Sequence, residues 1–145
     1  MTVFTPADAD FEARVRRSFA EQTAMATLGA SLQAVAPGRA EIRLPYRADL
    51  CQQNGFLHGG ITTTIADTAA GYASYSLYAE SEAILTSEFS QHFLAPARGE
   101  AFLAVGQVLK PGRRLVIAEA EVFAESGGKS VPIAKMIATL IRLTG

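Results

Sequence analysis

The stretch that decides the fold runs from residue 58 to residue 73 and reads HGGITTTIADTAAGYA. It consists of apolar residues and small polar ones, and Asp67 is the only formally charged residue between Asp49 and Glu80. A charge inside an apolar segment is costly unless it is paired or hydrogen-bonded. Carboxylates kept in such places are often functional, so Asp67 is the first candidate for a catalytic residue.

The composition predicts one globular domain, residues 1–145. Hydrophobic residues make up 49% of the 145 positions, which is enough for a core without disulfides. The formal net charge of -1 argues against a nucleic-acid-binding protein held by bulk electrostatics. Cys51 is the only cysteine, so no intrachain disulfide or cysteine-based metal site is expected, and a reducing cytoplasm fits.

Neither a signal peptide nor a membrane span is predicted. Residues 1–19 carry acidic and basic side chains without an apolar run. The most apolar segment, residues 59–79, is interrupted by Asp67 and by several threonines and serines, which is typical of a buried helix and not of a membrane helix.

Two helical regions are predicted. The first spans about residues 6–20, because Pro6 suits a first turn and apolar side chains recur every four positions at Phe11, Val15 and Phe19. With the apolar patch that follows, it gives an N-terminal helical segment, residues 1–29. The second region, residues 61–78, is the central helix.

Strand patterns with a period of two lie on both sides of the central helix. Residues 31–35 and 40–46 alternate around Pro37-Gly38, which predicts a hairpin. After the helix, turn signals separate four further strands, at residues 83–93, 100–109, 114–124 and 131–143. Successive turn-bounded strands after one helix indicate an antiparallel sheet packed on that helix, which is an α+β fold.

The central helix has two predicted faces. One apolar stripe is expected to pack on the sheet and consists of Ile61, Ile65, Thr68, Ala69 and Tyr72. Asp67 lies nearly opposite Ile65, and its neighbours three and four residues away are small: Thr63, Thr64, Ala70 and Gly71. Such a face allows another backbone or a narrow ligand to approach the carboxylate. The alternative is a structural carboxylate tied to a threonine hydroxyl inside the core.

Gly59 and Gly60 place backbone N–H groups at the start of this helix. Together with the helix dipole, these groups can bind an anion or polarise a carbonyl oxygen. That is the arrangement an oxyanion site needs. His58 beside them, and the carboxylate further along, make the pattern more specific than a glycine pair alone.

Two motifs carry a resemblance to a known family. The first comprises Gln52, Gly55, His58, Gly59, Gly60 and Asp67, and the second reads LTSEF at residues 85–89 and continues to FLAPA at residues 93–97. They resemble the hotdog-fold thioesterases of the phenylacetic-acid-degradation (PaaI-like) family, and the resemblance covers roughly residue 30 to the C-terminus. It implies a hotdog fold, with an antiparallel sheet wrapped around a long central helix, and hydrolysis of acyl-CoA.

The resemblance also implies catalytic roles. Asp67 would activate a water as general base or attack the thioester as nucleophile, and an amide of the His-Gly-Gly turn, here Gly59, would bind the oxyanion. His58 would fix that turn or act directly, Thr86 would hydrogen-bond near the acid, and Gln52, where the family often has Asn, would position the water.

The family's sites form between two subunits. Asp67 would therefore face the His58-Gly59-Gly60 turn of a partner chain, in a homodimer or in a dimer of dimers, which is a homotetramer.

Candidate substrate-binding residues are Gly60, Asn54, Phe56, Arg113 and Arg114. The two arginines suit the CoA phosphates, although solvated turn charges are the ordinary interpretation. No metal is expected, since His92, placed in the core or at an interface, and His58 are the only histidines. No cofactor is expected beyond the CoA of the substrate, and neither nucleic acid nor membrane is a predicted partner.

The predicted function is hydrolysis of a medium-chain or aromatic acyl-CoA to the free acid and CoA. Two alternatives stay open. A hotdog dehydratase of 3-hydroxyacyl thioesters needs a histidine paired with an acid, which His58 and Asp67 could supply. A non-catalytic acyl-CoA-binding domain would need no acid chemistry.

Overall fold

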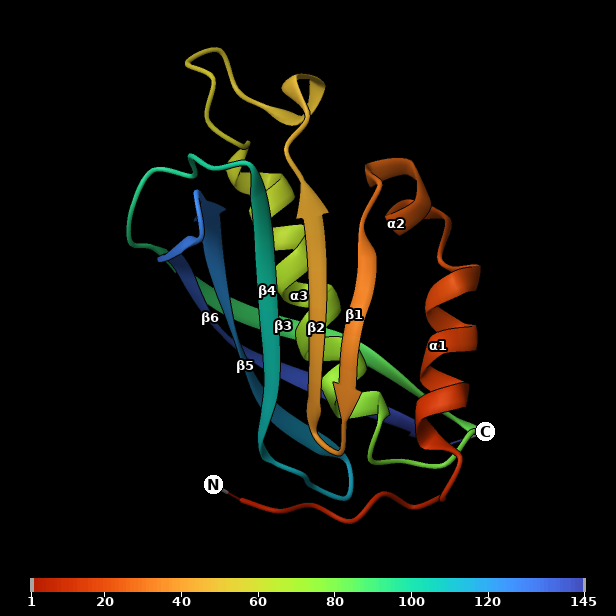
Figure 1. Cartoon of the computed structure of the whole chain (residues 1–145). Coiled ribbons are helices and arrows are strands. Elements are labelled where there is room, and N and C mark those ends of the chain that lie inside the picture. Colours follow the sequence, from red (N-terminus) through yellow and green to blue (C-terminus); the bar gives the residue numbers. More distant parts are fainter. Residues whose placement is uncertain (1, 145) are drawn as a thin grey trace.

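Six strands form one antiparallel sheet that curves around a long helix (Figure 1). The computed structural model describes residues 2–144. The predicted hotdog arrangement is confirmed, and each predicted strand lies within two residues of its observed bounds. In sheet order the strands are β1 (Ser31–Ala36), β2 (Arg39–Pro45), β4 (Ala101–Lys110), β5 (Leu115–Ser126), β6 (Lys129–Thr144) and β3 (Glu82–Phe93).

The alternating sequence of the strands produces two different sheet faces. Every second residue of β5 from Val116 to Ala124 is buried, and Ala118 and Ala120 pair with the buried Ala138 and Met136 of β6. Successive side chains of a strand point to opposite faces. One face of the sheet therefore forms the core, and the central helix packs on it.

The central helix, α3 (Gly59–Tyr75), approaches the sheet closely. A Cβ at Gly106 of β4 would lie 2.2 Å from the carbonyl oxygen of Ala69, so glycine is required at this contact. Of the predicted sheet-facing stripe, Ile61 packs half-buried against the core, whereas the prediction was wrong for Thr68, which is half-buried outside it. Small side chains on the buried side of α3 allow its backbone to come close to the sheet. The buried alanines of the helix are Ala66, Ala69, Ala70 and Ala73.

The ends of α3 also differ from the prediction of residues 61–78. The helix begins two residues earlier because the His58 side chain caps its first turn. It ends at Tyr75, where Ser76 leaves the helix and its hydroxyl accepts a hydrogen bond from the Gly38 N–H at 2.8 Å.

The N-terminal helical segment forms two helices beside β1, α1 (Phe11–Glu21) and α2 (Thr23–Leu28) (Figure 1). The prediction that α1 starts near Pro6 was wrong. The Ala7 N–H donates to the carbonyl of Leu77 at 3.0 Å, so residues 6–10 follow the end of α3 instead of forming a helical turn.

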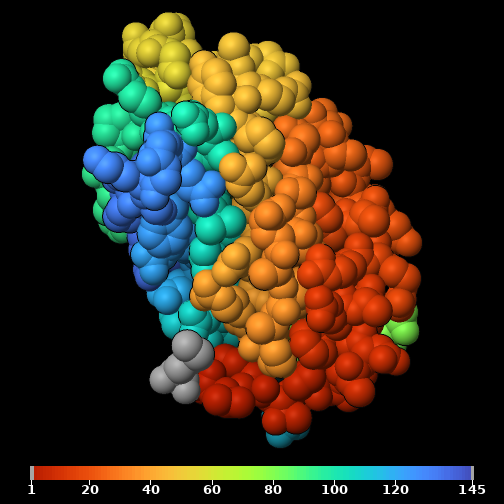
Figure 2. Space-filling model, viewed as in Figure 1, coloured from red at the N-terminus to blue at the C-terminus, as the bar shows by residue number. Residues whose placement is uncertain are grey.

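Arg14 fastens α1 to the rest of the molecule. Its buried guanidinium donates to the Asp8 carboxylate at 2.7 Å and to the Tyr78 carbonyl at 2.6 Å, and it lies 4.4 Å from the centre of the Tyr75 ring. Figure 2 shows the result as a continuous surface of N-terminal residues over one side of the molecule.

Strand β3 is an edge of the sheet and pairs only with β6 in the described chain. It exposes apolar side chains at Leu85, Phe89 and Phe93. His92 on the same strand is exposed, which excludes the core position predicted for it. No helix within residues 2–144 is long and apolar enough to cross a membrane.

Candidate active site

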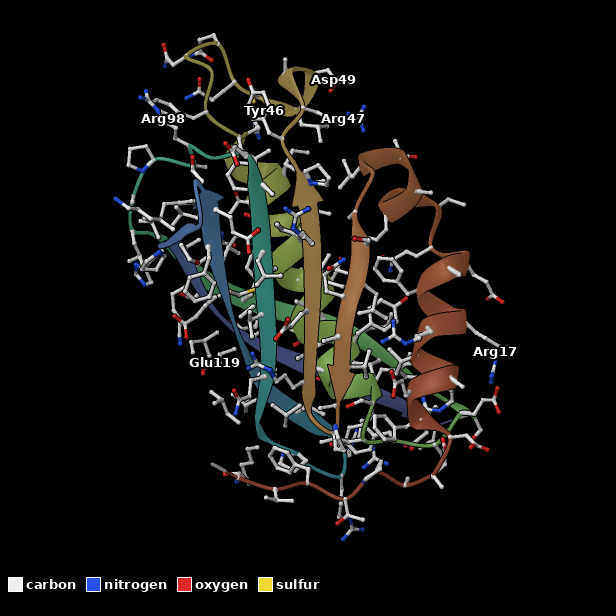
Figure 3. The ribbon with its side chains drawn as sticks, in the orientation of Figure 1. Arg17, Tyr46, Arg47, Asp49, Arg98 and Glu119 are labelled. Atoms are coloured by element: carbon white, nitrogen blue, oxygen red, sulfur yellow. The ribbon has the colours of Figure 1, made fainter. Side chains whose placement is uncertain are left out.

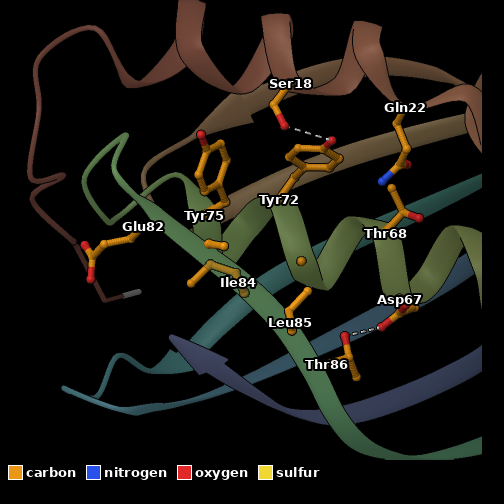
Figure 4. A pocket seen from close by; sticks show the side chains of 12 residues that line it. Ser18, Gln22, Asp67, Thr68, Tyr72, Tyr75, Glu82, Ile84, Leu85 and Thr86 are labelled. Carbon is orange, nitrogen blue, oxygen red and sulfur yellow. Dashed lines mark hydrogen bonds between the residues drawn. The ribbon is translucent and has the colours of Figure 1, made fainter. Parts of the chain in front are cut away.

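Asp67 is half-buried on α3, and its side chain faces β3. The Thr86 hydroxyl donates to Asp67 Oδ1 at 2.6 Å (Figure 4). This is the one side-chain hydrogen bond of the carboxylate within residues 2–144, so Oδ2 stays open. A carboxylate with one oxygen fixed and the other open can take a proton from water or attack a carbonyl carbon.

A cavity of about 630 Å³ lies beside this carboxylate, between α1, α3 and β3 (Figure 4). Its floor is α3 from Asp67 to Tyr75, one wall is the start of β3, and the other wall is formed by Ser18 and Gln22 of the N-terminal segment. The volume is in the range of small-molecule binding sites. The acid therefore lies at a site that can hold a ligand.

Tyr72 gives this cavity a buried phenol. Its hydroxyl shares a hydrogen bond with the Ser18 hydroxyl at 3.2 Å, and its ring packs against Phe19 and Tyr75. Burial raises the pKa of Tyr72, and the hydrogen bond with Ser18 opposes this only in part. The phenol is therefore neutral at physiological pH.

Glu82 lines the cavity where β3 begins, but its carboxylate is already hydrogen-bonded to other residues of the chain. Its carboxylate accepts hydrogen bonds from the Ala79 N–H at 2.9 Å and from Arg142 Nε at 3.0 Å. Burial alone would raise the pKa of Glu82, but these two donors outweigh it and hold the pKa below its ordinary value. Glu82 is therefore an ionised structural group.

The His58 turn lies at the other end of α3. His58 Nδ1 accepts a hydrogen bond from the Gly60 N–H at 2.9 Å, so the side chain is the N-cap of the helix. The Gly59 N–H has no partner within residues 2–144 and is available to an incoming oxygen. A Cβ at Gly59 would lie 3.3 Å from the Phe93 ring, so glycine also leaves room beside this amide.

One chain does not bring the acid and this amide together. Gly59 and Asp67 are eight residues apart on the same helix, which is about 12 Å along its axis. The sequence-predicted residues therefore form two groups, one at Asp67 and Thr86 and the other at His58, Gly59 and Gly60.

Gln52, Asn54 and Phe56 lie in the loop that leads into the His58 turn. Gln52 Oε1 accepts a hydrogen bond from the Asn54 N–H, and the Gln52 N–H donates to the Phe56 carbonyl at 2.9 Å. Gly55 completes the turn with a φ of 83°, which favours glycine. The side-chain oxygen of Gln52 thus holds its own loop, while Asn54 is exposed and the Phe56 ring is half-buried.

The predicted CoA-binding arginines, Arg113 and Arg114, lie in the exposed turn between β4 and β5. This turn is at the opposite end of the sheet from the Gln52 loop, as the pairing of Pro45 with Ala101 requires. Arg98 lies at the same end as that loop and stacks 5.1 Å from the Phe56 ring centre (Figure 3).

Sequence reasoning missed Ser18, Gln22 and Gln91. The first two reach the cavity only because α1 folds back over α3, and no local pattern indicates this. Gln91 has a buried amide whose nitrogen and oxygen lack partners within the described residues. Its place in a strand with exposed apolar neighbours could have indicated an interface.

Comparison with known proteins adds to this geometry. A sequence profile of the thioesterase superfamily matches residues 54–131, which include His58, Asp67 and Thr86. A candidate esterase of Saccharolobus solfataricus is 32% identical over 92 residues, which are 63% of this chain and 64% of that protein. The chain thus spans just under two thirds of the length of that relative.

Solved structures agree with the fold. A thioesterase family protein of Silicibacter pomeroyi is 49% identical, covers 93% of this chain and 99% of its own, and superimposes with a TM-score of 0.91. The PaaI protein from the phenylacetic acid degradation operon of E. coli is 21% identical, with a TM-score of 0.83 and coverage of 94% and 95%, and this similarity concerns the fold alone.

Proposed function

Since the chain belongs to the thioesterase superfamily, we propose that it is an acyl-CoA thioesterase, which converts an acyl-CoA and water into a free acid and CoA. The observation that carries the proposal is the Asp67 carboxylate. One of its oxygens is held by Thr86, the other is open, and a cavity of about 630 Å³ begins beside it.

Asp67 has two possible chemical roles. As general base it takes a proton from water while the water oxygen attacks the thioester carbonyl carbon. As nucleophile its own oxygen attacks that carbon, and water then hydrolyses the mixed anhydride. In both routes the carbon–sulfur bond breaks, and CoA leaves with a proton on its sulfur.

The oxyanion that forms on the carbonyl oxygen needs a hydrogen-bond donor. Within residues 2–144 the Gly59 N–H is unpartnered; it lies at a helix N-terminus and is held in place by the His58 cap, which are the features of such a donor. Because it is about 12 Å from Asp67 along the helix, we place the Gly59 of a second copy opposite the acid.

The edge strand β3 supports a homodimer with shared active sites. It has an unpaired edge in the described chain, exposes Leu85, Phe89 and Phe93, and contains the unpartnered buried amide of Gln91. An open apolar edge and an unsatisfied amide are both costly in an isolated chain. Apolar side chains on the outer sheet face, at Leu115, Ile137 and Leu143, further support a dimer of dimers.

The acyl group and the CoA of the substrate occupy different regions of this site. A medium-chain or aromatic acyl group occupies the cavity over α3, and the CoA passes Phe56 and Asn54 beside the His58 turn. Arg113 and Arg114 of a partner chain remain candidates for its phosphates, and Arg98 is a further one, because it is exposed next to Phe56.

The position of His58 favours hydrolysis over dehydration. A dehydratase needs this histidine paired with an acid, but within residues 2–144 its ring has no carboxylate partner, and its Nδ1 accepts the capping bond from Gly60. A non-catalytic binding domain would not need an open carboxylate oxygen beside the cavity.

The deciding experiment measures free CoA released from acyl-CoAs ranging from acetyl to palmitoyl, and from phenylacetyl-CoA. Wild type is compared with Asp67→Asn and with a matched control, Asp49→Asn, in which an exposed carboxylate loses its ion pair with Arg47. We expect kcat to fall at least about a hundredfold in the first variant alone.

The products and the affinities separate the other functions. An enoyl thioester in place of free thiol would support the dehydratase. Acyl-CoA binding without release by any of the three proteins would support the binding domain.

A further inference from the structure

We propose that Gln22 is a specificity-determining residue, whose side-chain amide oxygen accepts a hydrogen bond from a hydroxyl group on the acyl group. The inference rests on the proposed thioesterase function. It concerns the N-terminal segment, which contributes none of the catalytic residues.

The backbone at the α1–α2 junction directs this side chain inward. Gln22 has extended backbone angles, φ -81° and ψ 96°, and it separates the two helices. Its N–H donates to the Phe19 carbonyl at 3.0 Å, and its carbonyl accepts from the Met25 N–H at 3.1 Å. Both flanking helices thus fix the position of Gln22, and its side chain lines the cavity together with Thr68 (Figure 4).

The Gln22 amide has no hydrogen-bond partner within residues 2–144, and its Oε1 is buried. Other polar groups that line the cavity are already bonded: the Thr68 hydroxyl to the Thr64 carbonyl, Tyr72 to Ser18, and Glu82 to Arg142. A buried amide oxygen without a hydrogen-bond donor is costly unless something else donates to it. We assign the missing partner of this amide oxygen to the ligand that binds in the cavity.

The location of the amide indicates what it contacts. Thr68, which also lines the cavity, follows Asp67 directly in the sequence. Gln22 belongs to one wall of the cavity and Thr86 to the opposite wall, formed by β3, with α3 as the floor between them. An acyl group lying on that floor, with its carbonyl at Asp67, passes between the two walls. A hydroxyl on the acyl group can therefore reach Gln22, whereas a plain hydrocarbon leaves the amide unsatisfied.

The test uses two matched substrate pairs. One pair is octanoyl-CoA and 3-hydroxyoctanoyl-CoA, and the other is phenylacetyl-CoA and 4-hydroxyphenylacetyl-CoA. For each pair, kcat/KM of the hydroxylated member is divided by that of the plain member. Wild type is compared with Gln22→Leu and with Gln33→Leu, which makes the same change at an exposed glutamine of β1 outside the cavity.

We expect Gln22→Leu to lower the ratio about tenfold in at least one pair, on the scale of one hydrogen bond, and Gln33→Leu to leave both ratios unchanged. The substrate pair whose ratio falls more shows which hydroxyl position on the acyl group lies near the Gln22 amide. Ratios that stay the same in both pairs would overturn the inference. Gln22→Met, which keeps the length of the side chain, repeats the test if the leucine variant melts at a lower temperature.

A binding measurement separates this inference from the proposed function. Calorimetry gives the affinities of 4-hydroxyphenylacetate and phenylacetate without any turnover. If no acyl-CoA releases CoA but Gln22→Leu still removes a preference for the hydroxylated acid, the thioesterase proposal fails and the role of Gln22 stands. If CoA is released while neither the kinetic ratios nor the acid affinities respond to Gln22, this inference alone fails.

Discussion

The Thr86 hydroxyl and Asp67 Oδ1 lie 2.6 Å apart and join the edge strand to the central helix. The bond orients the carboxylate from the strand that also forms the open edge of the sheet. Pairing of that edge with a second copy would therefore stabilise the orientation of the acid as well.

Thr86→Val is expected to lower kcat about tenfold, because the isosteric side chain removes one hydrogen bond to the ionised carboxylate. Thr86→Ser keeps the hydroxyl and is expected to retain most of the activity. CoA release at saturating substrate measures both variants. Equal loss in the two would show that the methyl group matters and the hydrogen bond does not.

Gly59→Pro tests the oxyanion donor, since proline removes the N–H yet suits the first position of a helix. The extended backbone of His58, φ -59° and ψ 136°, is compatible with a following proline. We expect kcat to fall about a hundredfold or more. Gly59→Ala is the control, because it keeps the N–H and makes the same Cβ contact with Phe93; a similar loss in both variants would argue for crowding instead.

A mixture of two inactive variants tests whether the active site is shared. When Asp67→Asn and Gly59→Pro chains are unfolded, mixed and refolded together, each mixed dimer should contain one site with an intact acid and an intact amide. We expect the mixture to regain about a quarter of wild-type activity per chain, from half of the dimers forming as mixed pairs with one working site each. No recovery from a mixture of well-folded dimers would place the whole site within one chain.

His58→Asn separates capping from proton transfer, because asparagine is also a good N-cap. We expect this variant to keep its stability and most of its activity. His58→Ala is expected to lose about 1 kcal/mol of unfolding free energy, measured by urea denaturation. Full stability of the asparagine variant with kcat reduced a hundredfold would instead assign His58 a direct chemical role.

Glu82→Gln tests a pH effect on stability. The folded-state pKa of Glu82 lies below its ordinary value, so its ion pair with Arg142 stabilises the protein above the ordinary carboxyl pKa. That stabilisation is lost as the pH falls through the folded pKa. In urea denaturation across a pH series, wild type should therefore be more stable than Glu82→Gln at pH 7, and the two should converge in acid.

Glu80→Gln, at the exposed carboxylate that pairs with Arg17 on the surface, should match wild type throughout. A difference between wild type and Glu82→Gln that persists unchanged into strong acid would contradict the assignment of the effect to ionised Glu82.

The sheet could be predicted from the sequence because its signals are local. Alternation and turn residues decide where each strand begins and ends, and they do not depend on distant contacts. The start of α1 could not be predicted, because Ala7 and Asp8 bond to Leu77 and Arg14 and these contacts override the helical tendency of residues 6–10.

In the candidate site, too, the residues with a local sequence signal could be predicted, and those placed by distant contacts could not. Asp67 and the His58 turn stand out by charge and by glycine spacing, and the contact of Thr86 with the acid followed from the family resemblance. Gln22 has no such signal, since its place at the cavity depends on how α1 folds back over α3.

The close contact between Gly106 and Ala69 has a consequence for how this protein can evolve. It holds the helix that carries Asp67 against the sheet, so mutations there threaten the fold and the position of Asp67 together. The wall with Ser18 and Gln22 lies before residue 54, where the superfamily match begins. With the roles proposed above, changes in α1 and α2 could therefore alter the acyl preference while Asp67, Thr86 and the His58 turn stay unchanged.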